Sequence, residues 1–143
     1  MISQTVEYAL RAAVAVAQSA SKKLTAQEIS QITRVPVSYL SKVLHLLVRG
    51  GIIKATRGIH GGYALTVAPD ALSVLDVVNA IDPVKRIRAC PIGLTSHGSS
   101  LCSLHGRLDA VLEQTEQSFG NTSIAELINC PGSPPLCEVA KSA

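Results

Sequence analysis

Two helical patterns that are separated by only three residues constrain the fold of this chain most strongly. Thr25 and Glu28 have the spacing of a capping box, which opens a short helix with isoleucines on its apolar face. After a tight turn over residues 33–35, Pro36 starts a second helical pattern, whose stripe of leucine and valine ends at Gly50. Two helices joined by so short a turn predict a helix-turn-helix unit.

The face of the second helix opposite that stripe is polar and basic. It carries side chains of the kind that contact base edges and phosphates: Ser38, Tyr39, Ser41, Lys42 and His45. We therefore expect a recognition helix that binds double-stranded DNA. A packing role for Tyr39 stays open, and His45 is expected to face solvent or phosphate.

A glycine-rich segment connects two runs of β-prone residues after the second helix. The runs span 52–56 and 63–67, and residues 57–62 supply the glycines that a hairpin tip needs for positive φ. This pattern predicts a wing, whose backbone approaches a minor groove while Arg57 and His60 donate hydrogen bonds. The alternative, a phosphate cradle for a nucleotide, lacks the Lys-Ser/Thr pair of a P-loop and the flanking βαβ pattern.

Composition and charge agree with a small helical protein that binds phosphates. The chain has 143 residues, enough for one domain, and 47% of them are apolar but only 3% aromatic, so helices with close backbones are favoured. Residues 1–67 hold eight Lys/Arg and two acidic residues, a net charge of +6, whereas the rest of the chain carries −3. A basic half is typical of a nucleic-acid-binding surface, although a solvated basic face would carry the same charge.

The remaining chain is predicted to form a linker, a long helix and a tail. The expected organisation is a winged helix-turn-helix domain over 1–82, a linker and sensor loop over 83–102, a dimerisation helix and a short final helix over 103–128, and a flexible tail over 129–143. The long helix has an apolar stripe centred on Leu108 and Leu112, and the chain is too small to cover it. The sequence thus predicts a mostly α homodimer.

Four cysteines, all in the second half of the chain, indicate metal ligands or redox thiols. No apolar segment is long enough to span a membrane, so a cytoplasmic location without membrane contact is expected, and disulfides are rare in that compartment. Cys90 and Cys102 bound the loop before the long helix. Cys130 and Cys137 flank a proline-rich turn and have no assigned partner.

Four motifs taken together resemble one family of bacterial regulators. The motifs are 7–12 (EYALRA), 38–44 (SYLSKVL), 57–63 (RGIHGGY) and 75–81 (LDVVNAI). They resemble the Rrf2 family, and the similarity extends over nearly the whole chain. This resemblance implies a homodimeric winged helix-turn-helix regulator with a cluster-binding loop before the long helix.

The resemblance also implies roles for individual residues in DNA binding. It assigns Ser38, Tyr39 and Lys42 to the recognition helix and Arg57, His60, Gly61 and Tyr63 to the wing. Where a cluster-binding member of the family has glutamate, this chain has Ser41, which implies a different preferred DNA sequence.

Cluster-binding members of the family imply a set of metal ligands as well. Cys90 and Cys102 match the outer two of three cysteines, and Cys102 with His105 resembles a Cys-x-x-His pair. The middle cysteine is absent, with His97 near its place, and Glu7 of the partner subunit is the implied acidic ligand. A 2Fe–2S iron-sulfur cluster is therefore expected rather than a 4Fe–4S cluster, because histidine replaces cysteine in known 2Fe–2S centres. Glu7 as a first-turn acid and His105 as an ordinary helix-face residue remain alternatives.

The sequence as a whole predicts a sequence-specific transcription regulator, a repressor that responds to redox, iron-sulfur or nitric oxide status through the loop from Cys90 to Cys102. The alternative is a cluster-free regulator that acts as a thiol switch or under the control of a partner protein. An enzyme is not expected, because no Cys-x-x-Cys lies beside a βαβ pattern and no oxyanion-type turn is present. A pure protein-interaction module would not need a basic recognition face together with an arginine-containing wing.

Overall fold

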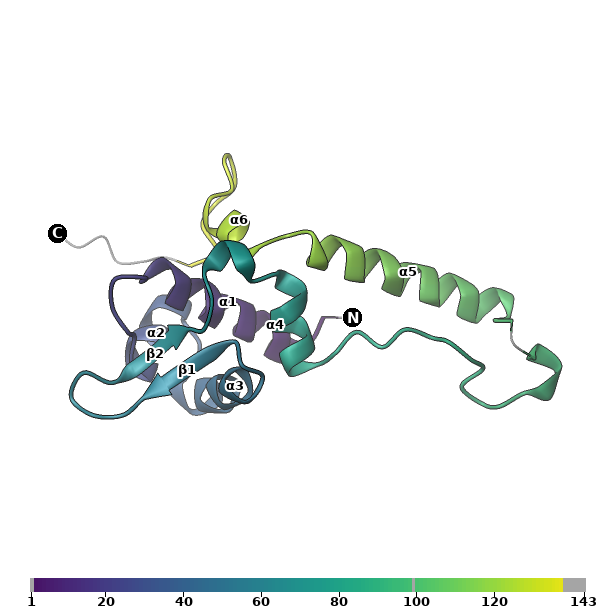
Figure 1. The fold of residues 1–143 in the computed structure, drawn as a ribbon, viewed down its shortest axis with the longest axis horizontal. Helices are drawn as coiled ribbons and strands as arrows, with labels where there is room; N and C mark the ends of the chain where they lie inside the picture. Colours follow the sequence, from purple (N-terminus) through teal and green to yellow (C-terminus); the bar gives the residue numbers. More distant parts are fainter. Residues whose placement is uncertain (1, 99, 138–143) are drawn as a thin grey trace.

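The computed structural model describes residues 2–98 and 100–137, most of which lie in helices (Figure 1). The elements in chain order are α1 (Gln4–Gln18), α2 (Ala26–Thr33), α3 (Val37–Arg49), β1 (Ile53–Thr56), β2 (Gly62–Leu65), the 3-10 turn η1 (Pro69–Ala71), α4 (Val74–Ile81), the 3-10 turn η2 (Thr95–His97), α5 (Ser103–Gly120) and α6 (Ile124–Ile128). This order confirms the predicted mostly α class, with a two-stranded wing and a long C-terminal helix.

Helix α1 forms the centre of the core. Its N-cap is Ser3, whose hydroxyl accepts a hydrogen bond from the backbone N–H of Val6. Alanines at 9, 12, 13 and 15 are fully buried, and such small side chains let neighbouring helices approach closely. Helices α2, α3, α4 and α6 all pack against α1. The core is thus built with hardly any aromatic side chains.

Helices α2 and α3 form the predicted helix-turn-helix. Thr25 and Glu28 make both hydrogen bonds of the capping box, and Arg34 closes α2 in the left-handed conformation with φ of 62°. The Ser30 hydroxyl donates to the carbonyl of Val35 at 2.6 Å and fixes the turn. Pro36 is the N-cap of α3 rather than its first residue, because its ψ of 136° is not helical.

The wing is a short antiparallel hairpin. Ile53 pairs with Leu65 and Thr56 pairs with Gly62, so the strands are shorter than the predicted runs of 52–56 and 63–67. The backbone of Tyr63 also exchanges two hydrogen bonds with Leu24, which anchors β2 to the segment between α1 and α2. Gly62 has φ of 145°, and a Cβ there would lie 2.8 Å from the Leu24 carbonyl oxygen, so this contact requires glycine.

A linker and α5 extend from the helical body as an arm (Figure 1). None of the 18 residues of α5 is buried within the chain. The Arg86 guanidinium holds the linker to α5 through a two-point contact with Asp109, at 2.7 Å for both nitrogens, and through Glu116 at 3.2 Å. Arg86 and Asp109 keep only 14% of their side-chain surface exposed. The basic linker is therefore clamped to the acidic side of α5.

The chain returns to the body after α5. Ile124 of α6 is fully buried, and its backbone N–H donates to the carbonyl of Leu72. Farther on, the Leu136 carbonyl accepts a hydrogen bond from Arg11 at 2.8 Å, and the Cys137 thiol is buried against α1. The segment expected to be a flexible tail is thus attached to α1 as far as Cys137. The rest of that segment, 138–143, lies outside the described residues.

Candidate DNA interface and sensor loop

The exposed face of α3 carries the predicted recognition residues. Leu40, Val43, Leu44 and Leu47 are fully buried against the body, which turns the opposite face of the helix to solvent. Ser38, Ser41, Lys42 and His45 are all exposed on that face. The Ser41 hydroxyl donates to the Val37 carbonyl at 3.0 Å, as helical serines often do, but it also lies at the surface.

Tyr39 has a different environment from these neighbours. It is half-buried, its hydroxyl lies 2.6 Å from the hydroxyl of Thr5, and its ring packs edge-to-face on Tyr8 with centroids 5.4 Å apart. These contacts tie α3 to the first turns of α1. They favour the packing role that the sequence left open for Tyr39.

The wing presents the other predicted DNA contacts. Arg57 and His60 are exposed at the hairpin tip, while Tyr63 is half-buried in β2. The N–H of Gly61 donates to the Gly58 carbonyl at 2.9 Å, and a Cβ at Gly61 would overlap the carbonyls of Thr56 and Gly58. Gly61 therefore serves the shape of the tip, whatever contact its backbone makes with a ligand.

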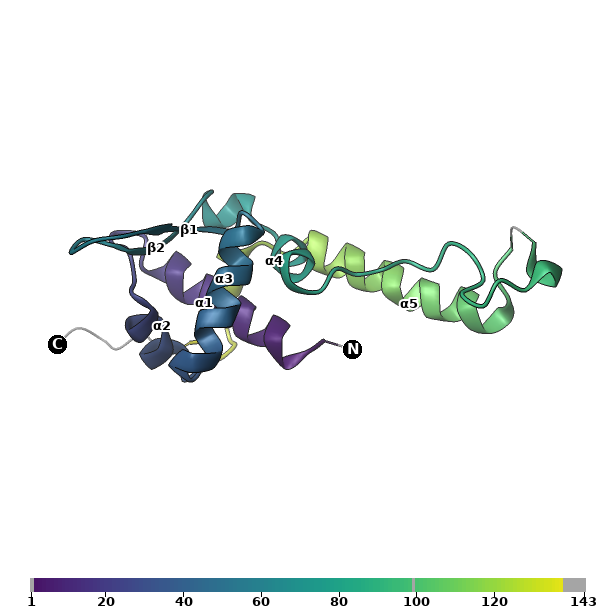
Figure 2. The same cartoon turned by 90° about the horizontal axis from the view of Figure 1, so that it is seen from below.

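Helix α3 and the wing share one side of the molecule, the lower side in Figure 1, and Figure 2 views that side. The sequence from residue 29 to residue 69, which contains α3 and the wing, has no aspartate or glutamate but has five Lys/Arg: Arg34, Lys42, Arg49, Lys54 and Arg57. An acid-free surface of this kind attracts phosphates without local repulsion. Lys54, one of the eight basic residues of the N-terminal half, lies on the exposed part of β1 and adds a cation to the wing.

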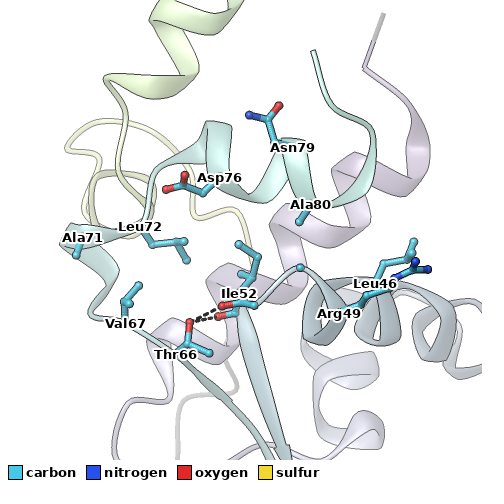
Figure 3. A pocket seen from close by; sticks show the side chains of 12 residues that line it. Leu46, Arg49, Ile52, Thr66, Val67, Ala71, Leu72, Asp76, Asn79 and Ala80 are labelled. Carbon is cyan, nitrogen blue, oxygen red and sulfur yellow. Dashed lines mark hydrogen bonds between the residues drawn. The ribbon is translucent and has the colours of Figure 1, made fainter. Parts of the chain in front are cut away.

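The end of α3, the segments that flank the two strands, and α4 line an open pocket of about 660 Å³ (Figure 3). Its polar groups serve the fold: the Thr66 hydroxyl donates to the carbonyls of Gly51 and Ile52, and Asp76 accepts from the N–H of Ser73. Asn79 accepts from the N–H of Val84. The lining residues include no cysteine, histidine or serine, and the Thr66 hydroxyl is bonded to backbone carbonyls rather than to a base, so the pocket holds no nucleophile paired with a base.

The loop at the end of the arm holds the predicted sensor thiols. Backbone N–H groups of Leu94, Ile92 and Gly93 hold the pKa of the Cys90 thiol below its usual range. Gly93 has φ of 68°, the left-handed conformation that turns successive N–H groups toward one point. Such nests of N–H groups surround the sulfurs of many iron-sulfur sites.

Cys102 has a separate partner, His105. Cys102 is the N-cap of α5, where its sulfur accepts from the backbone N–H of His105 and lies 3.2 Å from the imidazole Nδ1. The Cys-x-x-His spacing therefore brings its two side chains together.

The other predicted ligands do not join this pair within one chain. Glu7 lies on α1 and forms an ion pair with Arg11 at 2.9 Å, whereas the loop lies at the far end of the arm (Figure 1). The side chain of His97 lies outside the described residues. Across the residues that the structure describes, no group of three or more His, Cys, Asp or Glu is close enough to hold a metal ion.

The two peripheral cysteines lie away from the loop, near the body. Cys130 is exposed and contacts the Ser133 hydroxyl. Cys137 is buried at 4% exposure, and burial raises the pKa of its thiol. Both are placed outside the sensor loop, as the sequence interpretation assumed.

Comparison with known proteins agrees with this geometry. A family profile described as "Iron-dependent Transcriptional regulator", that of Rrf2, matches residues 2–130. The chain belongs to the Rrf2 family. It is therefore a helix-turn-helix transcriptional regulator of a DNA-binding family and not an enzyme, as the sequence predicts.

Individual Rrf2 relatives are distant in sequence. A relative from Aquifex aeolicus with an HTH-type transcriptional regulator name is 26% identical over 132 residues, which cover 90% of this chain and 92% of the relative. The HTH-type transcriptional regulator IscR of Erwinia tasmaniensis is 29% identical over 71% of this chain, and the match spans only 62% of that protein.

Solved structures show the same fold. CymR, the global cysteine regulator of B. subtilis, superposes with a TM-score of 0.72 at 19% identity, covering 89% of this chain and 95% of CymR. IscR of T. potens gives a TM-score of 0.72 at 18% identity, covering 88% and 84% of the two chains. In the described part of this chain, no helix combines the length and the hydropathy that a membrane span requires.

Proposed function

We propose that the protein is a homodimeric repressor that reads duplex DNA through α3 and the wing, and that the thiols of the loop from Cys90 to Cys102 control this binding. The observation that carries the DNA-binding part is the exposed, acid-free surface that α3 and the wing form on one side of the molecule. Cations there neutralise phosphates, while the short side chains of Ser38 and Ser41 can reach base edges.

Homodimerisation is supported by the apolar surface of the arm. Leu104, Leu108 and Val111 are 60%, 45% and 61% exposed on α5. A groove of about 620 Å³ also lies between α4, α5 and the first turn of α1. Its lining includes Val6, Val78, Leu112 and Phe119. A second copy of α5 would cover these side chains, and a two-fold dimer would place two α3 helices for two half-sites.

Regulation would act through this dimer, because the loop and the wing lie at opposite ends of the molecule (Figure 1). A change in the loop cannot touch DNA directly. It can alter how two α5 helices pack and so shift the population of dimers whose α3 helices match the half-site spacing. The Arg86 clamp transmits such a change, because it ties the linker that leaves α4 to the side of α5.

The donor chemistry of the loop fits part of a cluster site. The sulfur of Cys90 lies among backbone N–H groups, and Cys102 with His105 forms a second donor pair. A complete set would require the loop to bring these donors together and the partner subunit to supply Glu7, which would then give up its bond to Arg11. A bound 2Fe–2S cluster would supply a centre sensitive to oxidant and nitric oxide. The residues of this chain would hold it and tune its charge.

The thiol switch is the second candidate, and the lowered pKa of Cys90 favours it, because thiolates react with oxidants. Oxidation of Cys90 and Cys102 to a disulfide would transfer two electrons to a peroxide and release water. Alternatively, a partner protein would bind the arm and set the dimer arrangement without any change at the cysteines.

Anaerobic purification separates these candidates. A cluster predicts a visible absorption band with stoichiometric iron and sulfide, both lost in Cys90→Ser but kept in the matched variant Cys130→Ser. A thiol switch predicts no band, and peroxide then changes DNA affinity in the wild type but not in Cys90→Ser. If the protein has no visible absorption band and binds DNA fully in every redox state, control by a partner protein is the candidate that the result supports. Absence of duplex binding in every state would contradict the proposed function itself.

A further inference from the structure

The tip of the wing carries an apolar side chain in an unusual position. Ile59 is 98% exposed, more than any other large apolar residue of the described chain, among which Ile92 follows at 75%. The tip is held in place by the hydrogen bond from Gly61 to Gly58 and by the close contacts around Gly61. Because isoleucine is branched at Cβ, its χ1 is also restricted. The hairpin therefore presents Ile59 to solvent in a nearly fixed geometry.

The surroundings of Ile59 are cationic. Arg57 and His60 flank it and are exposed, Lys54 lies on β1 below it, and the nearest acidic residue along the chain in the C-terminal direction is Asp70. An apolar protein groove as partner would not require this ring of basic groups. The minor groove of DNA has both features, because phosphates form its two edges and deoxyribose forms its walls.

The position of the wing permits this contact. The hairpin extends beyond the helical body on the side that α3 occupies, at the end of the molecule opposite to the arm (Figures 1 and 2). When a recognition helix lies in a major groove, a neighbouring extension of the same domain reaches the adjacent minor groove. The side chain at the tip would enter that groove first.

We propose that Ile59 acts as an apolar wedge in the minor groove and makes DNA affinity depend on the deformability of the base step beneath the wing. This inference rests on the proposed DNA binding through α3 and the wing. Isoleucine cannot donate to the acceptors on the groove floor, and the groove of B-DNA is only about 6 Å wide, so Ile59 fits only where the groove opens. Pyrimidine–purine steps open at low cost, whereas A-tracts are stiff and narrow.

The test compares the full-length wild type with Ile59→Ser by selection from a randomised duplex library. The wild type should enrich a TA or CA step at the two positions under the wings, and Ile59→Ser should lose this enrichment while the bases read by α3 stay the same. On the duplex that the wild type selects, Ile59→Ser should lose about tenfold in affinity per wing, as expected for one buried isoleucine, and hence about a hundredfold in a dimer with two wings. It should also reduce the bend that circular-permutation mobility reports.

Three control variants make the outcome specific. Ile59→Val should keep the enrichment, and Val67→Ser, which alters another exposed apolar residue at the base of the wing, should have no effect. Arg57→Ala should weaken binding to all duplexes alike. If Arg57→Ala has no effect, the wing does not touch DNA and the proposed function is wrong at this point.

Some outcomes would contradict the role of Ile59 but not the proposed DNA binding through α3 and the wing. If Arg57→Ala weakens binding but Ile59→Ser retains affinity, step enrichment and bend, Ile59 is not a wedge. The same conclusion follows if Ile59→Ser changes only self-association in light scattering, because the residue would then contact protein.

Discussion

The contact between Tyr39 and α1 can be separated from DNA recognition by single substitutions. Tyr39→Phe removes the hydroxyl that lies 2.6 Å from Thr5 but keeps the ring that packs on Tyr8. One such hydrogen bond contributes about 1 kcal/mol, so the free energy of unfolding should fall by about that amount. Tyr39→Ala also deletes the edge-to-face pair and half-buried ring surface, and it should cost about 2–3 kcal/mol in total.

Urea unfolding followed by circular dichroism measures both effects. A double-mutant cycle with Thr5→Val should return a coupling of about 1 kcal/mol between the two hydroxyls. Without urea, where the wild type and Tyr39→Phe are both folded, the two proteins should bind DNA with the same affinity. If Tyr39→Phe reduces DNA affinity but not stability, the hydroxyl contacts DNA and the packing role assigned to it is incorrect.

Three further variants test other parts of the structure. Replacing both Leu108 and Leu112 by lysine should yield monomers in light scattering with weak DNA binding, and dimers of normal size would argue against α5 as the interface. Because the Arg86 guanidinium lowers the pKa of Asp109 to about 2 from an ordinary value of 3.8, their ion pair should stabilise the arm fully above pH of about 4 and cease to do so as the pH falls toward 2. In limited proteolysis across this pH range, the arm of the wild type should become cleavable only at low pH, whereas the arm of Arg86→Met should be cleaved at every pH. Equal protection of both proteins would refute the role of the Arg86–Asp109 ion pair. Gly61→Ala should distort the wing tip and weaken DNA binding with little change in global unfolding, whereas full affinity would show that the tip tolerates a side chain.

Local patterns in the sequence were sufficient to predict most of the fold. The capping box of Thr25 and Glu28 gives the correct start of α2, and apolar periodicity gives the correct end of α3 before Gly50. These features depend on residues three or four positions apart, so they can be read without the tertiary structure. The wing could also be predicted from local sequence, because Gly58 and Gly62 adopt positive φ angles that favour glycine.

Contacts between distant segments could not be predicted in this way. Nothing local links Arg86 to Asp109, Tyr39 to Thr5, or Cys137 to Arg11, because each contact depends on how helices pack. Local patterns therefore placed residue 86 only within the linker over 83–102 and left Cys137 without an assigned partner. The pairing of Cys102 with His105 was predictable because Cys102 is the N-cap of α5 and His105 follows it by three residues. The assignment of Glu7 depends on a second chain, and it stays a prediction.

The salt dependence of DNA binding tests the central claim most directly. If Lys42 and Arg57 neutralise phosphates, replacing either by alanine should reduce the slope of log affinity against log salt by about one per subunit, hence by about two in a dimer. Arg107→Ala, which removes an exposed cation from α5, is the matched control and should leave the slope unchanged. If Lys42→Ala and Arg57→Ala keep the wild-type slope and affinity, α3 and the wing do not form the DNA interface.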